Sequence, residues 1–368
     1  MKICFIVNSI EENSGGGWGR YAIDLIKEVR EAGSEVVILT SRFSKINDNF
    51  SGVNYRILPN HKQIIKGLFW LVFNIGKLKN IIKDCDCVHC LVEPYAPLTL
   101  FLSGTKPYFL TLHGTFAITH LKILKVKFFF KLALKKAKKV ICVSHFTLDM
   151  VEREINLNNI VVINNGVNFQ KFSKIKSAEE GAKIISVGML KWRKGYHLSI
   201  PAVALVKQKF PDVVYNIIGD QGDGYYFLEL KRLVERYKLE KNVFFLHNLT
   251  DDELIAYYGS SGLFLLTPVA VVNNFEGFGL VYLEAGACGL PVVGTKNSGS
   301  EDAVINGETG LLVEPKIEDI AEAIIKILTN KNLSIKLSEN GVKRAAMMDW
   351  KNISEHYMKI YELYNKNN

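Results

Sequence analysis

Short runs of consecutive apolar residues recur along the whole chain, and they constrain the fold more than any other feature of the sequence. Examples are KICFIVN (2–8), KIISVG (183–188) and LFLLT (263–267). Strands that are buried on both faces have this unbroken pattern, whereas strands with one wet face alternate. Helical patterns such as residues 18–33 and 251–262 separate the runs. The alternation predicts an α/β fold in which helices cover both faces of parallel sheets.

The length and the two series of strands predict two doubly wound domains. A chain of 368 residues is longer than one small domain needs. Residues 168–183 are polar and without periodicity, which is typical of a linker. We therefore expect an N-terminal domain over residues 1–168 and a C-terminal domain over residues 169–348. A helical pattern over residues 349–368 is expected to pack back towards the N-terminal domain.

The excess of positive charge lies in the first half of the chain. Residues 1–168 hold 22 Lys and Arg against 13 Asp and Glu, while the remaining residues hold 24 of each. Lysines mix with aromatic and aliphatic residues in segments 62–83 and 121–139. These segments are either amphipathic helices with solvated lysines or an attachment site for an anionic membrane surface. Because no recognised nucleic-acid-binding motif accompanies the charge, we expect no nucleic-acid partner.

The cysteines favour a reducing compartment and no metal site. The chain has six cysteines, and its first residues read as a strand and a loop instead of a secretory leader, so a cytoplasmic location is expected. The segment CDCVHC (85–90) concentrates potential metal ligands. Neighbouring residues of a strand point to opposite faces, and no second cysteine cluster completes a site. We interpret the segment as a buried strand with small thiols.

One glycine-rich loop and one basic loop each follow a predicted strand. Parallel sheets bind ligands at such loops, beyond the carboxyl ends of their strands. In NSIEENSGGGWGR, Gly16 and Gly17 lead into a helix, so that backbone can approach an anion closely. In VGMLKWRKGYH, Lys191, Arg193 and Lys194 precede a helix whose dipole favours negative charge. An anionic ligand would relieve that conflict, so we expect one at this loop. A flexible glycine loop and a solvated lysine cluster are the alternatives.

The third loop is EGFGLVYLE (276–284), which places two glutamates around the start of a helix. If the helix begins near Gly279, Glu276 lies just ahead of it and Glu284 lies about one and a half turns inside. The two carboxylates can then reach different parts of one ligand. The backbone N–H groups at such a helix start can bind phosphate between them; those expected to do so belong to Gly277, Phe278, Gly279 and Leu280.

These loops resemble the retaining GT-B glycosyltransferases of family 4. E-x7-E is followed by E-A-x-A-x-G-x-P-V-V, LTLHGT resembles the H-x-T loop of the family, and VINNGVN resembles its linker strand. VGMLKWRKG resembles V-G-R-L-x-x-x-K-G, and GSEDAVINGETGLLV resembles G-x-x-E-x-V-x-x-G-x-x-G-x-L-V. The motifs follow the family order along most of the chain. The resemblance implies the GT-B fold, with two Rossmann-like domains facing a cleft.

The resemblance also implies roles for individual residues. His113 would lie beside the anomeric carbon, Lys194 would neutralise the departing diphosphate, and Glu276 would hold hydroxyls of the transferred sugar, which makes these three the expected catalytic residues. Glu284 would bind the ribose hydroxyls. The other donor-binding residues that it implies are Gly16, Gly17, Arg193, His247, Asn248, Gly277, Phe278, Gly279 and Leu280.

Two positions depart from the family pattern. Met189 stands where the family has an arginine, and either Arg193 or Lys191 is the candidate to replace its charge. Asp302, with Glu301 beside it, stands where the family has the glutamate of G-x-x-E.

The function that the resemblance implies is a retaining transfer of a hexose-type sugar from a UDP- or GDP-sugar. The acceptor would be a glycan or lipid-linked glycan in cell-surface polysaccharide synthesis, and the enzyme would lie at the inner face of the cell membrane. The sugar nucleotide is a substrate, so no cofactor and no metal are expected. A sugar-nucleotide epimerase and a non-catalytic membrane-associated binding protein are the alternatives on the same architecture.

Overall fold

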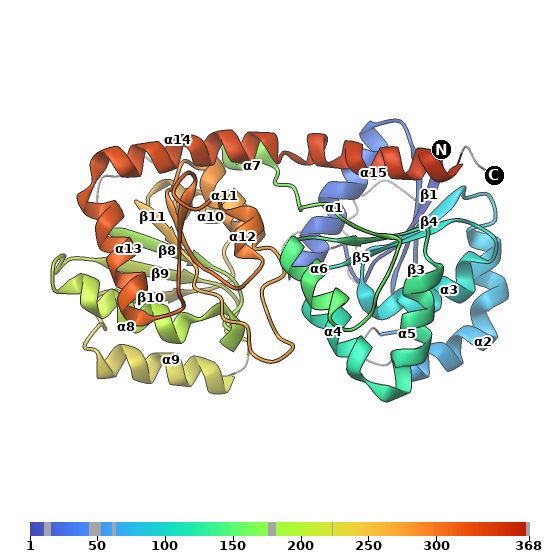
Figure 1. Cartoon of the computed structure of the whole chain (residues 1–368), viewed down its shortest axis with the longest axis horizontal. Coiled ribbons are helices and arrows are strands. Elements are labelled where there is room, and N and C mark those ends of the chain that lie inside the picture. Colours follow the sequence, from blue (N-terminus) through green and yellow to red (C-terminus); the bar gives the residue numbers. More distant parts are fainter. Residues whose placement is uncertain (11–15, 44–52, 61–63, 176–181, 223, 366–368) are drawn as a thin grey trace. The chain divides into compact units, whose positions relative to one another are not determined.

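The computed structural model describes residues 1–10, 16–43, 53–60, 64–175, 182–222 and 224–365. The chain divides into two compact units (Figure 1). Unit 1 comprises Met1–Asn165 together with Trp350–Asn368, and unit 2 comprises Gly166–Asp349. The last helix of the chain therefore belongs to the same unit as the first strand.

Unit 1 is built on a seven-stranded parallel sheet in the order β3-β2-β1-β4-β5-β6-β7. The apolar runs predicted as strands form its centre, where β1, β4 and β5 are buried along almost their whole length. The strands are β1 Lys2–Ile6, β2 Glu35–Ser41, β3 Val53–Leu58, β4 Cys87–Cys90, β5 Tyr108–Leu112, β6 Lys139–Cys142 and β7 Ile160–Val162.

Helices connect the strands of unit 1, and α15 packs against α1 (Figure 1). They are α1 Gly16–Glu31, α2 Ile64–Ile81, α3 Ala96–Ser103, α4 Thr115–Lys122, α5 Leu124–Lys136, α6 His145–Glu152 and α15 Trp350–Asn365, with the 3-10 turn η1 Glu93–Tyr95.

Buried hydroxyl and imidazole groups fasten α15 to the sheet of unit 1. His89 on β4 lies between the Tyr361 hydroxyl, 2.6 Å from Nδ1, and the Thr111 hydroxyl, 2.9 Å from Nε2. Tyr21 on α1 joins the same network, because its hydroxyl lies 3.2 Å from Thr111 Oγ1 and 2.9 Å from the Tyr357 hydroxyl. Burial lowers the pKa of His89 to about 3, so the ring is neutral in this network at pH 7.

Unit 2 repeats the architecture with a six-stranded parallel sheet in the order β10-β9-β8-β11-β12-β13. Its strands are β8 Lys183–Val187, β9 Val214–Ile218, β10 Val243–Leu246, β11 Leu263–Leu265, β12 Val292–Thr295 and β13 Gly310–Val313. Its helices are α7 Phe169–Phe172, α8 Tyr196–Lys207, α9 Gly224–Arg236, α10 Asp251–Gly259, α11 Leu280–Ala287, α12 Ser300–Ala303, α13 Ile317–Thr329 and α14 Lys331–Met347, with the 3-10 turn η2 Trp192–Lys194.

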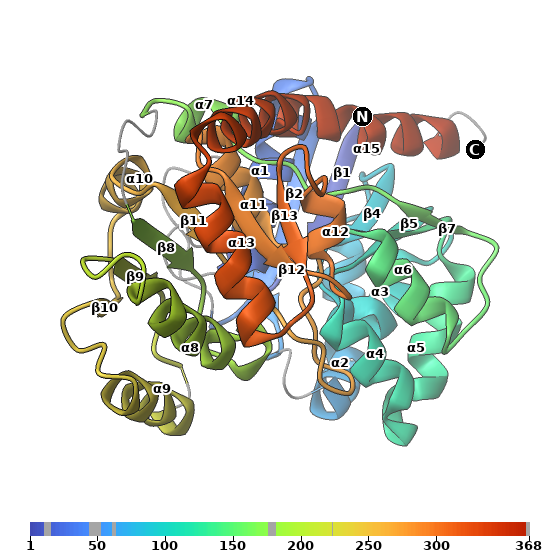
Figure 2. The same cartoon turned by 60° about the vertical axis from the view of Figure 1, so that its left-hand side comes forward.

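Both sheets reverse their strand order beside the first strand of the unit. In unit 1 the reversal lies between β1 and β4, and in unit 2 it lies between β8 and β11. The chain leaves β8 for a helix that packs with α9 and α13, and leaves β11 for a helix that packs with α14 (Figure 2). Doubly wound sheets bind ligands beyond the carboxyl ends of the strands at such a switch point.

The predicted α/β fold with two doubly wound parallel sheets is confirmed. The interpretation of CDCVHC as a buried strand is confirmed for Cys87–Cys90, which form β4, and all six cysteines are buried free thiols. Among the described residues, no group of metal-ligating side chains and no helix long and apolar enough to cross a membrane is found.

We predict that Tyr361→Phe lowers the free energy of unfolding of unit 1 by about 1–3 kcal/mol, because it leaves a buried imidazole nitrogen of His89 without its partner. Urea denaturation followed by far-UV circular dichroism measures the change. Tyr364→Phe on the same helix, where the tyrosine is half-buried, is the matched control and should change stability by less than about 0.5 kcal/mol. Equal losses in the two variants would contradict the role of the network.

Candidate functional site

The basic turn after β8 is pressed against the end of β11 in unit 2. Gly195 ends the turn with φ 73°, and a Cβ there would lie 1.7 Å from the Thr267 carbonyl oxygen, so only glycine fits. The Thr267 hydroxyl donates to the Gly195 carbonyl at 2.8 Å, and Val269 N donates to the Arg193 carbonyl at 2.9 Å. The close approach carries Arg193 and Lys194 over the loop that follows β11.

The two cations meet Glu276, which the loop after β11 delivers. The Lys194 ammonium lies 2.7 Å from Glu276 Oε2, and the Arg193 guanidinium contacts the same oxygen. Lys194 and Glu276 are buried, with 8 % exposure each. The structure thus brings together three residues that the sequence assigned to one site. With two cations and one carboxylate, the cluster carries a net positive charge.

Burial and ion pairing have opposite effects on the pKa values of Glu276 and Lys194. Burial alone would raise the pKa of Glu276, but the charges of Arg193 and Lys194 outweigh it and lower the pKa to about 2. Burial lowers the pKa of Lys194 from its usual value, and the Glu276 carboxylate acts against that change. We take Glu276 as ionised at pH 7 because two cations contact the same oxygen. A carboxylate in this state can accept hydrogen bonds from neutral hydroxyls as well.

Helix α11 begins directly after this cluster, as the sequence predicted. Gly279 is its N-cap residue at φ 87°, and a Cβ there would lie 2.7 Å from the Tyr282 ring. The preceding residues Gly277 and Phe278 are buried with Glu276, so their backbone is fixed at the helix start. Glu284 lies inside α11 and is 2 % exposed, and the Tyr258 hydroxyl donates to its Oε2 at 3.1 Å.

The other predicted donor residues of unit 2 stand apart from the cluster. His247 and Asn248 are exposed and follow β10, which β9 separates from β8. Asn248 has φ 56°, a left-handed conformation that asparagine tolerates better than most residues.

A cavity of about 380 Å³ opens beside the basic turn of unit 2. It is lined by Trp192, His197, Leu198, Pro268, Val269, Ala270, Val271, Lys296, Asn297 and Pro315.

In unit 1 His113 follows β5, the strand next to the switch point between β1 and β4. Its Nε2 lies 2.9 Å from the Leu91 carbonyl oxygen, and its ring stands edge-on to Tyr21 at 4.6 Å between centroids. Burial lowers the pKa of His113 to about 4, although the bond to the carbonyl acts against it. Since a carbonyl only accepts, the neutral ring carries its proton on Nε2 and presents Nδ1 as an acceptor.

The glycine loop after β1 is described only in part. Gly16 is the first residue of α1, Gly17 follows it, and a Cβ on Gly17 would meet no atom within 4 Å. Residues 11–15 of the same motif lie outside the described part of the chain. Gly16, Gly17 and His113 thus belong to unit 1, whereas the other predicted site residues belong to unit 2.

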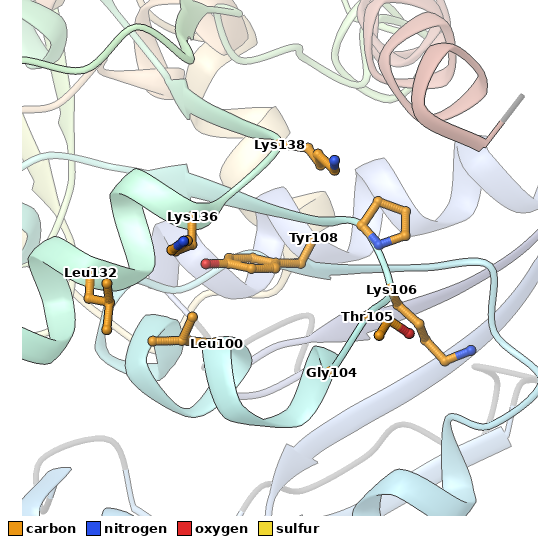
Figure 3. A pocket seen from close by; sticks show the side chains of 9 residues that line it. Leu100, Gly104, Thr105, Lys106, Tyr108, Leu132, Lys136 and Lys138 are labelled. Atoms are coloured by element: carbon orange, nitrogen blue, oxygen red, sulfur yellow. The ribbon is translucent and has the colours of Figure 1, made fainter. Parts of the chain in front are cut away.

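A second cavity, of about 270 Å³, lies in unit 1 (Figure 3). Tyr108, the first residue of β5, contributes to its wall together with Leu100 from α3 and Leu132 from α5. Lys106 at its rim is engaged in the fold, because its ammonium donates to the carbonyls of Lys83 and Cys85. The cavity is thus at the amino end of β5 and separate from His113.

Sequence reasoning missed two buried partners of the candidate site. Tyr258 holds Glu284, and Glu93 accepts hydrogen bonds from the backbone of His113 and Gly114. A signal for Glu93 exists in the sequence, since it is a single acid directly after an apolar strand and before a proline. Tyr258 gives no such signal, because a tyrosine in a helix is most often a packing residue.

Comparisons with known protein families cover nearly the whole chain. The family described as Glycosyltransferase Family 4 matches residues 15–171, and the family described as Glycosyl transferases group 1 matches residues 167–344. An uncharacterized glycosyltransferase of Methanocaldococcus jannaschii is 28 % identical over 94 % of both chains. A D-inositol 3-phosphate glycosyltransferase of Corynebacterium urealyticum is 31 % identical over 55 % of this chain and 50 % of its own length.

Solved structures show the same fold at low sequence identity. The structure of HepE from Anabaena in complex with UDP and glucose superposes with a TM-score of 0.81 at 21 % identity, covering 98 % of this chain and 99 % of that one. Sucrose-phosphate synthase from Thermosynechococcus elongatus gives a TM-score of 0.79 at 21 % identity over 100 % of both chains. The predicted GT-B fold is therefore confirmed.

We predict that Glu276→Gln lowers the free energy of unfolding of unit 2 by about 3 kcal/mol at pH 7, because the buried Lys194 loses its carboxylate partner. Since the pKa of Glu276 is lowered on folding, its stabilising contribution is present above about pH 4.5 and is lost as the pH falls towards 2. The difference from the natural protein should therefore shrink in that window, which thermal unfolding at several pH values measures.

Glu314→Gln is the control for this prediction, because Glu314 forms an exposed ion pair with Lys296 at 3.1 Å. Exposed pairs contribute about 0–1 kcal/mol. If the difference in free energy of unfolding between Glu276→Gln and the natural protein stays constant down to pH 3, the assignment of an ionised, paired Glu276 is contradicted.

Proposed function

The chain belongs to the family 4 glycosyltransferases, and from this premise we propose that it transfers a hexose-type sugar from a nucleoside diphosphate sugar with retention of the anomeric configuration. The observation that carries the proposal is the buried cluster of Arg193, Lys194 and Glu276 at the switch point of unit 2. The positive charge of the cluster suits a diphosphate, and its carboxylate suits the hydroxyls of a sugar joined to that diphosphate.

Each residue of the cluster has a distinct part in the proposed reaction. The Lys194 and Arg193 cations stabilise the charge that grows on the diphosphate as it departs, which is where fixed charges lower a barrier most. The Glu276 carboxylate accepts hydrogen bonds from hydroxyls of the transferred sugar. Glu284, held by Tyr258, accepts those of the ribose. The backbone N–H groups at the start of α11 add further donors for phosphate.

The bond changes follow from retention at the anomeric carbon. An acceptor hydroxyl attacks this carbon from the face that the diphosphate leaves, and the carbon–oxygen bond to the diphosphate breaks. A diphosphate oxygen takes the proton of the acceptor hydroxyl, so the products are the glycoside and the nucleoside diphosphate. The lysine and arginine supply the positive charge of this step, and the proposal assigns no role to a metal or cofactor.

We propose that Arg193 supplies the positive charge of the family arginine, whose position Met189 occupies in this chain. Its guanidinium lies in the cluster, whereas Lys191 is exposed at the start of the same turn. For the donor, UDP-glucose is the first probe, because the similar HepE structures contain UDP and UDP-glucose. The alternative base is guanine, and a panel of UDP- and GDP-sugars distinguishes the two.

The acceptor is proposed to be a glycan or lipid-linked glycan at the inner face of the cell membrane. Three exposed apolar side chains, Ile123, Leu124 and Phe128, lie at or just after the junction of α4 and α5, and Phe116 is exposed at the start of α4. Residues 115–139 contain lysines and no acid. Apolar side chains that enter the headgroup layer and lysines that meet anionic lipid favour reversible attachment. Phe130 is buried and does not take part.

The function is tested with a sugar-nucleotide panel and added glycan acceptors. Release of nucleoside diphosphate only when acceptor is present supports a transferase. Conversion of the sugar nucleotide without acceptor would instead identify an epimerase, and binding without turnover would identify a binding protein.

We predict that Lys194→Met lowers kcat at least about 100-fold, because the departing diphosphate loses a fixed cation. The fold should survive, since Arg193 continues to neutralise Glu276. Lys191→Met, on the same turn but exposed, is the control and should change kcat less than about threefold. Normal turnover in Lys194→Met would contradict the mechanism, and circular dichroism separates lost activity from lost structure.

We predict that the protein sediments with vesicles of anionic lipid, remains in solution with neutral ones, and is released at high salt, because each lysine near the surface contributes about 1 kcal/mol that salt screens. The double variant with Leu124→Ser and Phe128→Ser should bind anionic vesicles several-fold more weakly. Leu228→Ser, exposed on α9 of unit 2, is the control. Binding without preference for anionic lipid would contradict the proposal and favour a soluble acceptor.

A further inference from the structure

The switch point of unit 1 contains a buried acid that the proposed reaction does not use. Glu93 begins the η1 turn after β4 and is 1 % exposed. Its Oε1 accepts two hydrogen bonds, from His113 N at 2.6 Å and from Gly114 N at 3.2 Å. Its Oε2 is buried and has no hydrogen-bond partner among the described residues. Because two backbone N–H groups engage Oε1 and the protein encloses Oε2, we look for the role of Glu93 in what it does to its neighbours.

The backbone that Glu93 holds has no comparable support from its own side chains. Gly114 adopts φ 126° and ψ −104°, a conformation that disfavours any side chain. Helix α4 begins at the next residue, and its N-cap residue, Gly114, has no side chain with which to cap it. The Glu93 carboxyl, which comes from another part of the chain, satisfies two backbone N–H groups just ahead of α4 that would otherwise have no partner.

The same segment also fixes the ring of His113. Leu91 and Glu93 both follow β4, and the Leu91 carbonyl accepts from Nε2 while the Glu93 carboxyl accepts from the backbone N–H. Backbone and ring are thus held from two points that are two residues apart. The Tyr21 ring closes a further side of the imidazole. Moving the backbone at residue 113 would break the bond that selects the Nε2–H tautomer.

We propose that Glu93 is a positioning residue, which acts through the His113–Gly114 backbone to keep the His113 ring in one orientation and one tautomer. The proposal rests on the proposed function only for the importance of His113 to sugar transfer, where the family resemblance implies that His113 lies beside the anomeric carbon. The geometric part, that Glu93 determines the state of the ring, holds for this chain whatever it transfers.

The surroundings of Glu93 determine its protonation. In the described part of the chain, the titratable groups close enough to interact with its charge are Tyr21 on α1, Cys90 on β4 and Cys142 on β6, and His113 is bonded to it through its backbone. All four are neutral at pH 7, because burial raises the pKa of the phenol and of both thiols and lowers that of the imidazole. Burial likewise raises the pKa of Glu93, to about 7, against the opposing backbone hydrogen bonds. Oε1 can accept both N–H groups in either protonation state, with the proton on Oε2.

The experiment compares the ring of His113 in variants at position 93, using nitrogen NMR of protein labelled in histidine. The His113 signals are assigned by their absence from His113→Gln. In the natural protein we expect the Nε2–H tautomer alone and a neutral ring down to about pH 4. Glu93→Leu and the shorter Glu93→Asp should both give mixed tautomers and a pKa that moves towards 6.5, and the amides of residues 113 and 114 should exchange at least tenfold faster.

Glu93→Gln is the rescuing variant, because its amide oxygen can accept from both backbone N–H groups; it should keep the single tautomer. Thr99→Val is the matched control for general loss of stability, since it removes a different buried hydrogen bond, to the Tyr95 carbonyl. With a sugar nucleotide that the natural protein uses, Glu93→Leu should lower kcat at least tenfold and change the donor KM less than threefold.

An unchanged tautomer and unchanged amide exchange in both Glu93→Leu and Glu93→Asp would overturn the proposal. If Glu93→Leu fails to fold, Glu93→Asp and the exchange of the natural protein decide the question, because unprotected amides at residues 113 and 114 would also overturn it. The NMR measurement needs no turnover. A protein that transfers no sugar but shows the tautomer change would therefore refute the proposed function and leave the positioning role standing.

Discussion

The divergence of the chain after two adjacent parallel strands, β8 and β11, is the constraint on which the candidate site of unit 2 depends. One connection leads to a helix on the α9 and α13 face of the sheet, and the other to a helix that packs with α14. The two loops therefore begin side by side and share the space beyond the strand ends. Gly195 brings them into contact with Thr267, so the basic turn and Glu276 become one cluster.

That contact also explains how buried charges are tolerated at a helix start. Arg193 and Lys194 precede α8, where the helix dipole disfavours cations. Glu276 offsets this cost through direct pairing, but one carboxylate does not neutralise two cations. The remaining positive charge is held in a place that water reaches poorly, where its attraction for an anion is stronger than at the surface.

The sequence was sufficient for the fold because both sheets are parallel and buried, so their strands appear as unbroken apolar runs. It also predicted that Glu276 and the basic turn belong to one site, because both follow strands and their motifs match a family. The partners of these residues could not be predicted. Glu93 reaches His113 across 20 positions of sequence, and Tyr258 reaches Glu284 across 26. Such contacts depend on how helices pack, which periodicity does not encode.

The return of α15 to unit 1 has a consequence for recombination between relatives. The chain passes from unit 1 to unit 2 after Asn165 and back at Trp350. Within unit 2, the segments next to these two crossing points are hydrogen-bonded to each other. Val167 N donates to the Met348 carbonyl at 2.9 Å, and Phe169 N donates to the Asp349 carboxylate at 3.0 Å. A chimera made by one fusion point near residue 166 would give the sheet of unit 1 a foreign terminal helix. Two crossovers are needed, so that α15 and the sheet that carries His89 are inherited together.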